Sequence, residues 1–146
     1  MKIPTHLKHK PIYKIEDYSA VDGMYKNNPS VAGLSLGKAQ WKDTPFVPSV
    51  KVWRRSETRW SRQSEETTLT RALDMATLII KVLNKHYNGV DISSIDTIYG
   101  SLEITENPQY VEELDKFLTD EKTRKDLNAH IEMLSQALNQ YKIAIK

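Results

Sequence analysis

Hydrophobic and polar residues alternate between residues 32 and 63, which is the period of a strand with one buried face. Leu34 and Leu36 alternate with small or polar residues before a turn at 42–45, and the alternation resumes over 49–55. A second turn at 56–58 then returns the chain over 59–63. We therefore predict a β-hairpin region over 32–63. Residues 1–31 are rich in the turn formers Pro, Gly and Asn, so we expect an irregular segment with a short strand at 11–17.

A helical period replaces the alternation after residue 63. Ser64 is a typical capping residue, and Glu65 and Glu66 suit the positive end of a helix. Apolar residues recur at helical spacing as far as Asn88-Gly89, a pair that tolerates the left-handed cap conformation. The sequence therefore predicts a central helix over 64–88. Its apolar stripe is wide, so we expect this helix to be buried on most of its circumference.

Two further helices are predicted over 107–146, with Asn107-Pro108 and Asp120 as their start signals. The segment 91–105 is ambiguous, because it fits one face of a helix or an edge strand over 101–105. Together these elements predict a single α+β domain over residues 1–146. Its small antiparallel sheet of about three to four strands would pack against the buried central helix and the two C-terminal helices.

Charge and composition exclude several classes of protein. The 39% apolar and 27% charged shares are those of a globular domain, and the absence of Cys excludes thiol chemistry and Cys-based metal sites. Residues 1–62 hold 12 Lys and Arg against 5 Asp and Glu, whereas residues 63–146 hold 9 against 14. This split indicates either a basic binding face or two halves of complementary charge. The overall charge of +2 argues against nucleic acid as the partner.

Membrane and secretory signals are missing from the pattern. The N-terminus is positively charged but has no apolar run behind it, and the longest apolar stretch is far shorter than the ~20 residues that span a bilayer. We therefore expect a cytoplasmic protein that does not insert into membranes.

The best candidate for function is the segment from Trp53 to Glu66. Five cations lie within the 12 residues from Lys51 to Arg62, and a short loop at 56–57 would make Trp53 and Trp60 direct cross-strand neighbours. Arg side chains stacked on Trp rings suit an anionic or planar ligand. We therefore interpret the protein as a binding module for an anionic small molecule, with these candidate ligand-binding residues: Trp53, Arg54, Arg59, Trp60, Arg62, Gln63, Glu66, Arg71 and Asp74.

Three alternatives stay open from the sequence. In the first, the internal carboxylates of Glu65, Glu66 or Glu103 neutralise the cations, and the segment has only a structural role. In the second, the protein is an enzyme in which Glu66 or Asp74 is the general base and Arg62 or Arg71 stabilises negative charge. In the third, the apolar seam of 127–141 forms a homodimer through the C-terminal helix. Nothing in the sequence indicates a cofactor, and the four histidines lack the spacing of a metal site.

Several of these runs also carry a family resemblance. The run 60–66 (WSRQSEE), the run 33–41 (GLSLGKAQW) and the run 51–54 (KVWR), with Arg71 and Asp74, resemble a family of short bacterial proteins of unknown function. The resemblance covers roughly residues 5–85. It implies a bacterial intracellular protein and transfers no activity and no catalytic residue.

Overall fold

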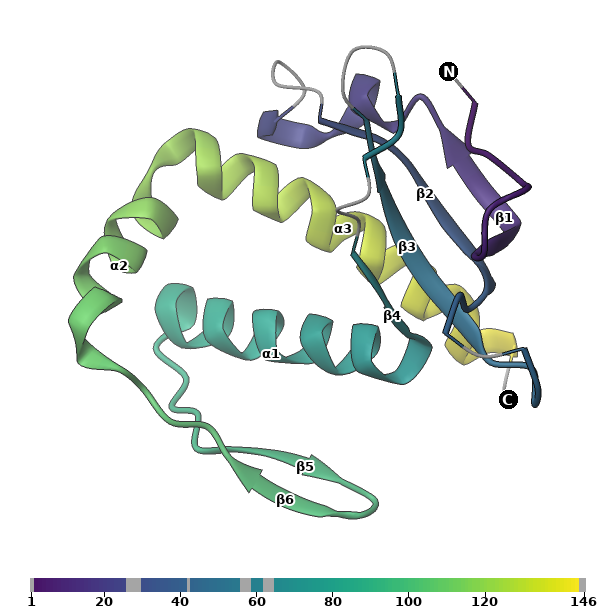
Figure 1. The fold of residues 1–146 in the computed structure, drawn as a ribbon. Helices are drawn as coiled ribbons and strands as arrows, with labels where there is room; N and C mark the ends of the chain where they lie inside the picture. Colours follow the sequence, from purple (N-terminus) through teal and green to yellow (C-terminus); the bar gives the residue numbers. More distant parts are fainter. Residues whose placement is uncertain (1, 26–29, 42, 56–58, 62–64, 145–146) are drawn as a thin grey trace. The chain divides into compact units, whose positions relative to one another are not determined.

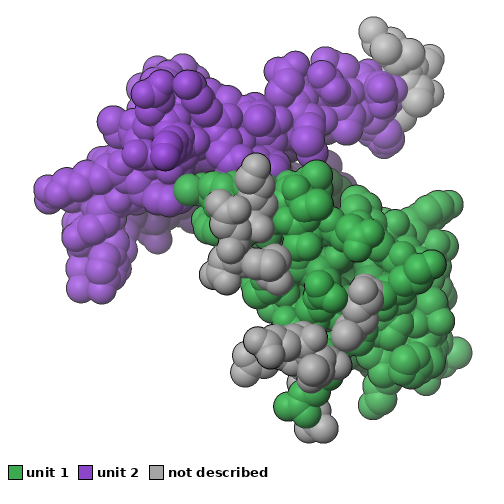
Figure 2. Space-filling model, turned by 90° about the horizontal axis from the view of Figure 1, so that it is seen from above, with its two compact units in different colours: residues 1–81 green, residues 82–146 purple. Residues whose placement is uncertain are grey.

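The computed structural model describes residues 2–25, 30–41, 43–55, 59–61 and 65–144. Contacts between its residues divide the chain into two compact units, Met1–Lys81 and Val82–Lys146 (Figure 2). Each unit is described by itself below. The boundary falls within one helix, α1, which spans Leu69–Asn88.

The first unit is built on a four-stranded antiparallel sheet in the order β1-β2-β3-β4 (Figure 1). Its strands are β1 Lys10–Glu16, β2 Val31–Lys38, β3 Pro48–Arg54 and β4 Glu66–Thr68. Two short 3-10 helices, η1 Tyr18–Val21 and η2 Gly23–Tyr25, follow β1. The α+β class and the strand predicted in the N-terminal segment are thereby confirmed.

The two faces of this sheet differ in an unexpected way. Ser35 of β2 and Ser49, Lys51 and Trp53 of β3 share one face, and all four are buried. The N-terminal segment contributes the buried side chains of Ile3, Pro4 and His9. The more deeply buried face of the sheet is therefore largely polar.

The opposite face of the sheet is apolar and only half-buried. It carries Leu34 and Leu36 of β2 and Val50 and Val52 of β3. With the first half of α1, these residues line an apolar groove of about 680 Å³. Leu83 is the one buried residue of α1 among those described, so this helix is more exposed than its wide apolar stripe predicted.

The helix begins later than the sequence predicted. The capping residue expected at Ser64 lies outside the described residues, and Glu66 belongs to β4, where it pairs with Lys51 of β3. The α1 helix starts only at Leu69. Glu66 therefore sits in a strand instead of the first helical turn, because cross-strand pairing to β3 overrides the local capping signal.

The predicted hairpin register is also corrected. The bridge that follows β3 joins Arg55 to Trp60, and the amide of Ser61 donates a hydrogen bond to the carbonyl of Arg54 (2.8 Å). Trp60 is thus opposite Arg55 and not opposite Trp53. The expected return strand over 59–63 is reduced to this one bridge among its described residues.

The second unit holds the remaining elements. A hairpin of β5 Ser94–Thr97 and β6 Gly100–Glu103 resolves the ambiguous segment in favour of strands. The short 3-10 helix η3 Pro108–Tyr110 leads into α2 Val111–Thr119, and α3 spans Glu121–Ala144. Both predicted start signals are confirmed. The Asn107 side chain accepts a hydrogen bond from the amide of Gln109, and the Asp120 side chain accepts one from the amide of Thr123 (3.0 Å).

Candidate functional site

A network of hydrogen bonds lies on the buried polar face of the sheet. At its centre is His9, whose side chain is fully buried. One ring nitrogen, Nδ1, lies 2.8 Å from Oε1 of Glu66, and the other, Nε2, lies 2.9 Å from the hydroxyl of Ser35. The same Glu66 oxygen accepts a hydrogen bond from the hydroxyl of Ser49 (2.7 Å), and Ser35 accepts one from the indole N–H of Trp53 (2.8 Å). Residues from the N-terminal segment and three strands are thereby joined.

One tautomer of His9 gives every donor of this network an acceptor. With the proton on Nδ1, the ring donates to Glu66 and accepts from the Ser35 hydroxyl at Nε2, so each donor has an acceptor. Serine, histidine and carboxylate then follow the order used in serine hydrolases. Ser35 is only 6% exposed and its oxygen already accepts the Trp53 indole N–H. The arrangement therefore fixes the side chains in place and does not present a nucleophile.

One carboxylate oxygen of Glu66 receives no hydrogen bond from the network. Oε1 accepts from His9, from Ser49 and from the backbone amide of Gln40 (3.1 Å). Oε2 is buried and has no hydrogen-bond partner. A buried carboxylate oxygen without a donor is costly, which makes it a candidate contact for a bound group.

Lys51 places a cation next to this network. It pairs with Glu66 across β3 and β4, and its Nζ lies 4.1 Å from the centroid of the Trp53 ring. Burial lowers the pKa of Lys51 below its usual value, and the negative charge of Glu66 opposes that shift. The amine therefore lies against an aromatic face, and the charge of Glu66 acts on it.

A cleft of about 870 Å³ opens beside these groups in the first unit. Trp53 and Trp60 lie edge to face in its wall, with ring centroids 5.7 Å apart, and Lys51 also lines it. The other lining residues come from the N-terminal segment and from the ends of strands: Pro4, His6, Leu7, Lys8, Gln40 and Ser61. We call this cavity the tryptophan cleft. Its aromatic walls and amino groups suit a planar molecule with an anionic group.

The structure separates the candidate residues named from the sequence. Trp53 and Trp60 lie in the cleft, and Glu66 belongs to the buried network beside it. Arg54 is taken up by Glu65, to which it donates at 2.9 Å. Arg59 is exposed.

Four of the candidate residues remain. Arg62 and Gln63 lie outside the described residues. Arg71 and Asp74 are exposed on α1 and line neither the cleft nor the apolar groove.

Sequence reasoning missed the residues at the centre of the network. His9, Ser35 and Ser49 belong to no functional motif. The alternation along β3 predicted only that Ser49, Lys51 and Trp53 share one face. A sheet face that carries two Ser and one Lys is typical of a side exposed to solvent. The covering N-terminal segment, which reverses that reading, has no local sequence signal.

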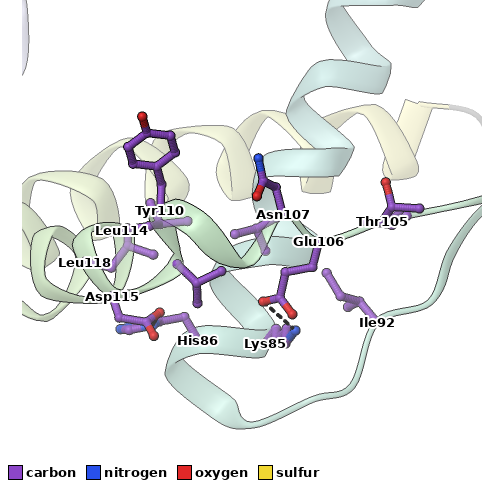
Figure 3. Close-up of a pocket in the computed structure, with 13 residues that line it drawn as sticks. Lys85, His86, Ile92, Thr105, Glu106, Asn107, Tyr110, Leu114, Asp115 and Leu118 are labelled. Atoms are coloured by element: carbon purple, nitrogen blue, oxygen red, sulfur yellow. Dashed lines mark hydrogen bonds and ion pairs between the residues drawn. The ribbon is translucent and has the colours of Figure 1, made fainter.

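The second unit has a cavity of its own, of about 800 Å³ (Figure 3). His86 and Asp115 lie side by side in its wall, with His86 Nδ1 2.9 Å from an Asp115 oxygen. Lys85 and Glu106 form a second ion pair at 3.4 Å. The rest of the lining is mostly aliphatic. The polar groups of both pairs already contact each other, so this cavity offers a ligand fewer free polar contacts than the tryptophan cleft.

Comparisons with known proteins give a family and no activity. No helix among the described residues is long and apolar enough to cross a membrane. No curated protein and no solved structure matches the chain. A family model does match, over residues 1–144, so the likeness extends beyond residues 5–85 into the C-terminal helices. The chain belongs to this family, a family of unknown function (DUF6530).

Proposed function

We propose that the protein binds a small planar molecule with an anionic group in the tryptophan cleft. One observation carries the proposal: Lys51 and the edge-to-face rings of Trp53 and Trp60 line the same cavity. Aromatic walls favour a flat ligand, and a partly desolvated cation attracts its anionic group more strongly than a surface cation would. This proposal keeps the two Trp residues of the sequence hypothesis and replaces its arginines by Lys51.

The buried network supports the same proposal. It ties the indole of Trp53 to Ser35, and the Lys51 amine packs on that indole ring, so the ligand would meet an aromatic wall whose position is already fixed. Preorganised contacts bind more tightly, because less conformational entropy is lost on binding. Lys8, which also lines the cleft, adds positive charge for an anion.

Intrinsic fluorescence tests the proposal directly. The chain has three Trp residues, and Trp41→Phe leaves only the two that line the cleft. We would titrate this variant with benzoates, nucleotides and phosphorylated pyridines and follow quenching together with the melting temperature. A ligand at about 100 times its Kd raises stability by about 2.7 kcal/mol.

Two further substitutions separate the cleft from the rest of the surface. Lys51→Met should abolish binding of any ligand found, whereas Arg71→Met, an exposed cation outside the cleft, should leave the affinity unchanged. A ligand whose affinity is equally insensitive to Lys51→Met and to Trp60→Leu would refute the proposal.

The alternatives from the sequence have less support. The enzyme hypothesis requires Glu66 or Asp74 to meet Arg62 or Arg71 at one cavity, and Asp74 and Arg71 lie on the exposed side of α1. Self-association through the seam over 127–141 stays a hypothesis, which light scattering at high protein concentration would test. The resemblance to a bacterial intracellular family supports a cytoplasmic location, which cell fractionation would test.

A further inference from the structure

We propose that Lys51 forms an imine with a planar aldehyde or ketone that carries an anionic group. The inference rests on the binding function proposed for the tryptophan cleft and narrows its ligand to carbonyl compounds. It assigns to Lys51 a covalent role in addition to that of a counterion.

The position of Lys51 sets it apart from the other lysines. It is the one buried lysine among the described residues, at 8% exposure, and it nevertheless lines the cleft. Its amine is packed against the Trp53 ring, 4.1 Å from the centroid, so a flat ligand in the cleft would lie close to the nitrogen. A desolvated amine that a ligand can reach is the arrangement expected of an imine-forming lysine.

The protonation of Lys51 fits this role. Only the neutral amine has the lone pair that attacks a carbonyl carbon, and burial lowers the pKa of Lys51 below its usual value. The charge of Glu66 acts in the opposite direction, and His9 lies beside Glu66 on the same face.

The step is a condensation that releases water. The lone pair of Nζ attacks the carbonyl carbon, a C–N bond forms, and the carbonyl oxygen takes up a proton to give a carbinolamine. Loss of that hydroxyl as water, with the remaining N–H proton leaving, gives the C=N bond. We assign the acceptance and return of this proton to the unpartnered Oε2 of Glu66, because Glu66 is the cross-strand partner of Lys51. No oxidant or reductant is consumed.

A matched pair of probes tests the proposal in the full chain. The first is 4-formylbenzoate, which is planar, anionic and an aldehyde, and the second is 4-(hydroxymethyl)benzoate, which lacks only the carbonyl. Each is incubated with the protein at neutral pH, and cyanoborohydride then reduces any imine to a stable secondary amine. Peptide mass spectrometry locates the adducts, and fluorescence of Trp41→Phe measures binding of the second probe.

We expect Lys51 to be labelled at least about tenfold more than Lys14, an exposed lysine on β1 that pairs with Glu16. Excess 4-(hydroxymethyl)benzoate should protect Lys51 and leave the labelling of Lys14 unchanged. Lys51→Arg, which cannot form an imine under these conditions, should lose the adduct. Lys14→Arg should leave the labelling of Lys51 intact.

The outcomes distinguish this proposal from the proposed function. If 4-(hydroxymethyl)benzoate binds in the cleft but Lys51 is labelled no more than Lys14, the imine is refuted and the binding function stands. If Lys51 is labelled selectively although the second probe does not bind, the imine stands and non-covalent recognition of the anion fails. Labelling spread over exposed lysines without binding would overturn both. If Lys51→Arg does not fold, the protection of Lys51 by 4-(hydroxymethyl)benzoate in the unmodified chain still tests whether the imine forms in the cleft.

Discussion

Replacing Glu66 by Leu should destabilise the protein more than any other single change in the network. The substitution removes the acceptor of two deeply buried donors, the Nδ1–H of His9 and the hydroxyl of Ser49. Each buried donor left without a partner costs about 1–3 kcal/mol. Lys51 also loses the negative charge of Glu66, which favours its protonated form. Since these terms overlap, we expect a loss of about 3–5 kcal/mol, a large part of the stability of a typical domain.

Urea unfolding followed by circular dichroism measures this loss. Glu66→Gln should cost less, about 1–2 kcal/mol, because its amide oxygen still accepts from His9 and Ser49, although neutral hydrogen bonds are about half as strong. Glu65→Gln is the matched control, because the Glu65 carboxylate is exposed and forms an ion pair with Arg54 at the surface. This substitution should lower the free energy of unfolding by less than about 1 kcal/mol.

A double substitution examines whether the cost comes from the hydrogen bond itself. His9→Phe combined with Glu66→Leu should cost less than the sum of the two single changes, because both polar partners are then removed together. Additive costs would contradict the network, and a Glu66→Leu loss no larger than that of Glu65→Gln would refute the reasoning.

Three further outcomes are expected. Gly37→Ala should weaken the β1–β2 pairing and lower stability by about 1–3 kcal/mol in thermal melts, because a Cβ there would collide with the backbone carbonyl of Lys10, whereas the open Gly89 position should respond only through its positive φ of 66°. The hydrogen bond from the Thr123 amide is the main reason that the pKa of Asp120 is lowered. Asp120 therefore stabilises the start of α3 above its unfolded pKa, and this stabilisation is lost as pH falls through the folded pKa. The rate of amide exchange in α3 should therefore change less with acid pH in Asp120→Asn than in the unmodified chain. His86→Gln should cost less than about 1 kcal/mol in urea unfolding, because its partner Asp115 is 53% exposed.

The fold was largely predictable because its signals are local. The alternation of 32–36 and 49–55 placed two strands, and the capping residues Asn107 and Asp120 marked the last helices. Glu66 shows where local signals fail. Its position after Ser64 matches a helix start, yet pairing with Lys51 draws it into β4. Tertiary contacts of this kind leave no trace in the neighbouring residues.

The candidate site was predictable only in part, for the same reason. Composition drew attention to Trp53 and Trp60, and the structure brings both into one cleft. Composition also drew attention to the arginines around them, but Arg54 forms an ion pair with Glu65. His9 lies 57 positions from Glu66 in the chain, and no spacing rule connects residues that meet only after the N-terminal segment folds over the sheet.

The distribution of polarity over the sheet itself argues that the network has a purpose beyond stability. Leu34 and Val50 stand on the face that is half-exposed, while Lys51 and Glu66 stand on the face that is buried. Replacing buried charged groups by apolar side chains is often neutral or stabilising, so selection for stability alone would favour the opposite arrangement. Groups that cost stability in this way are concentrated where a protein binds or reacts. Because Lys51 belongs to both the buried face and the tryptophan cleft, the cost of burying it is explained if that amine is the point at which a ligand is held.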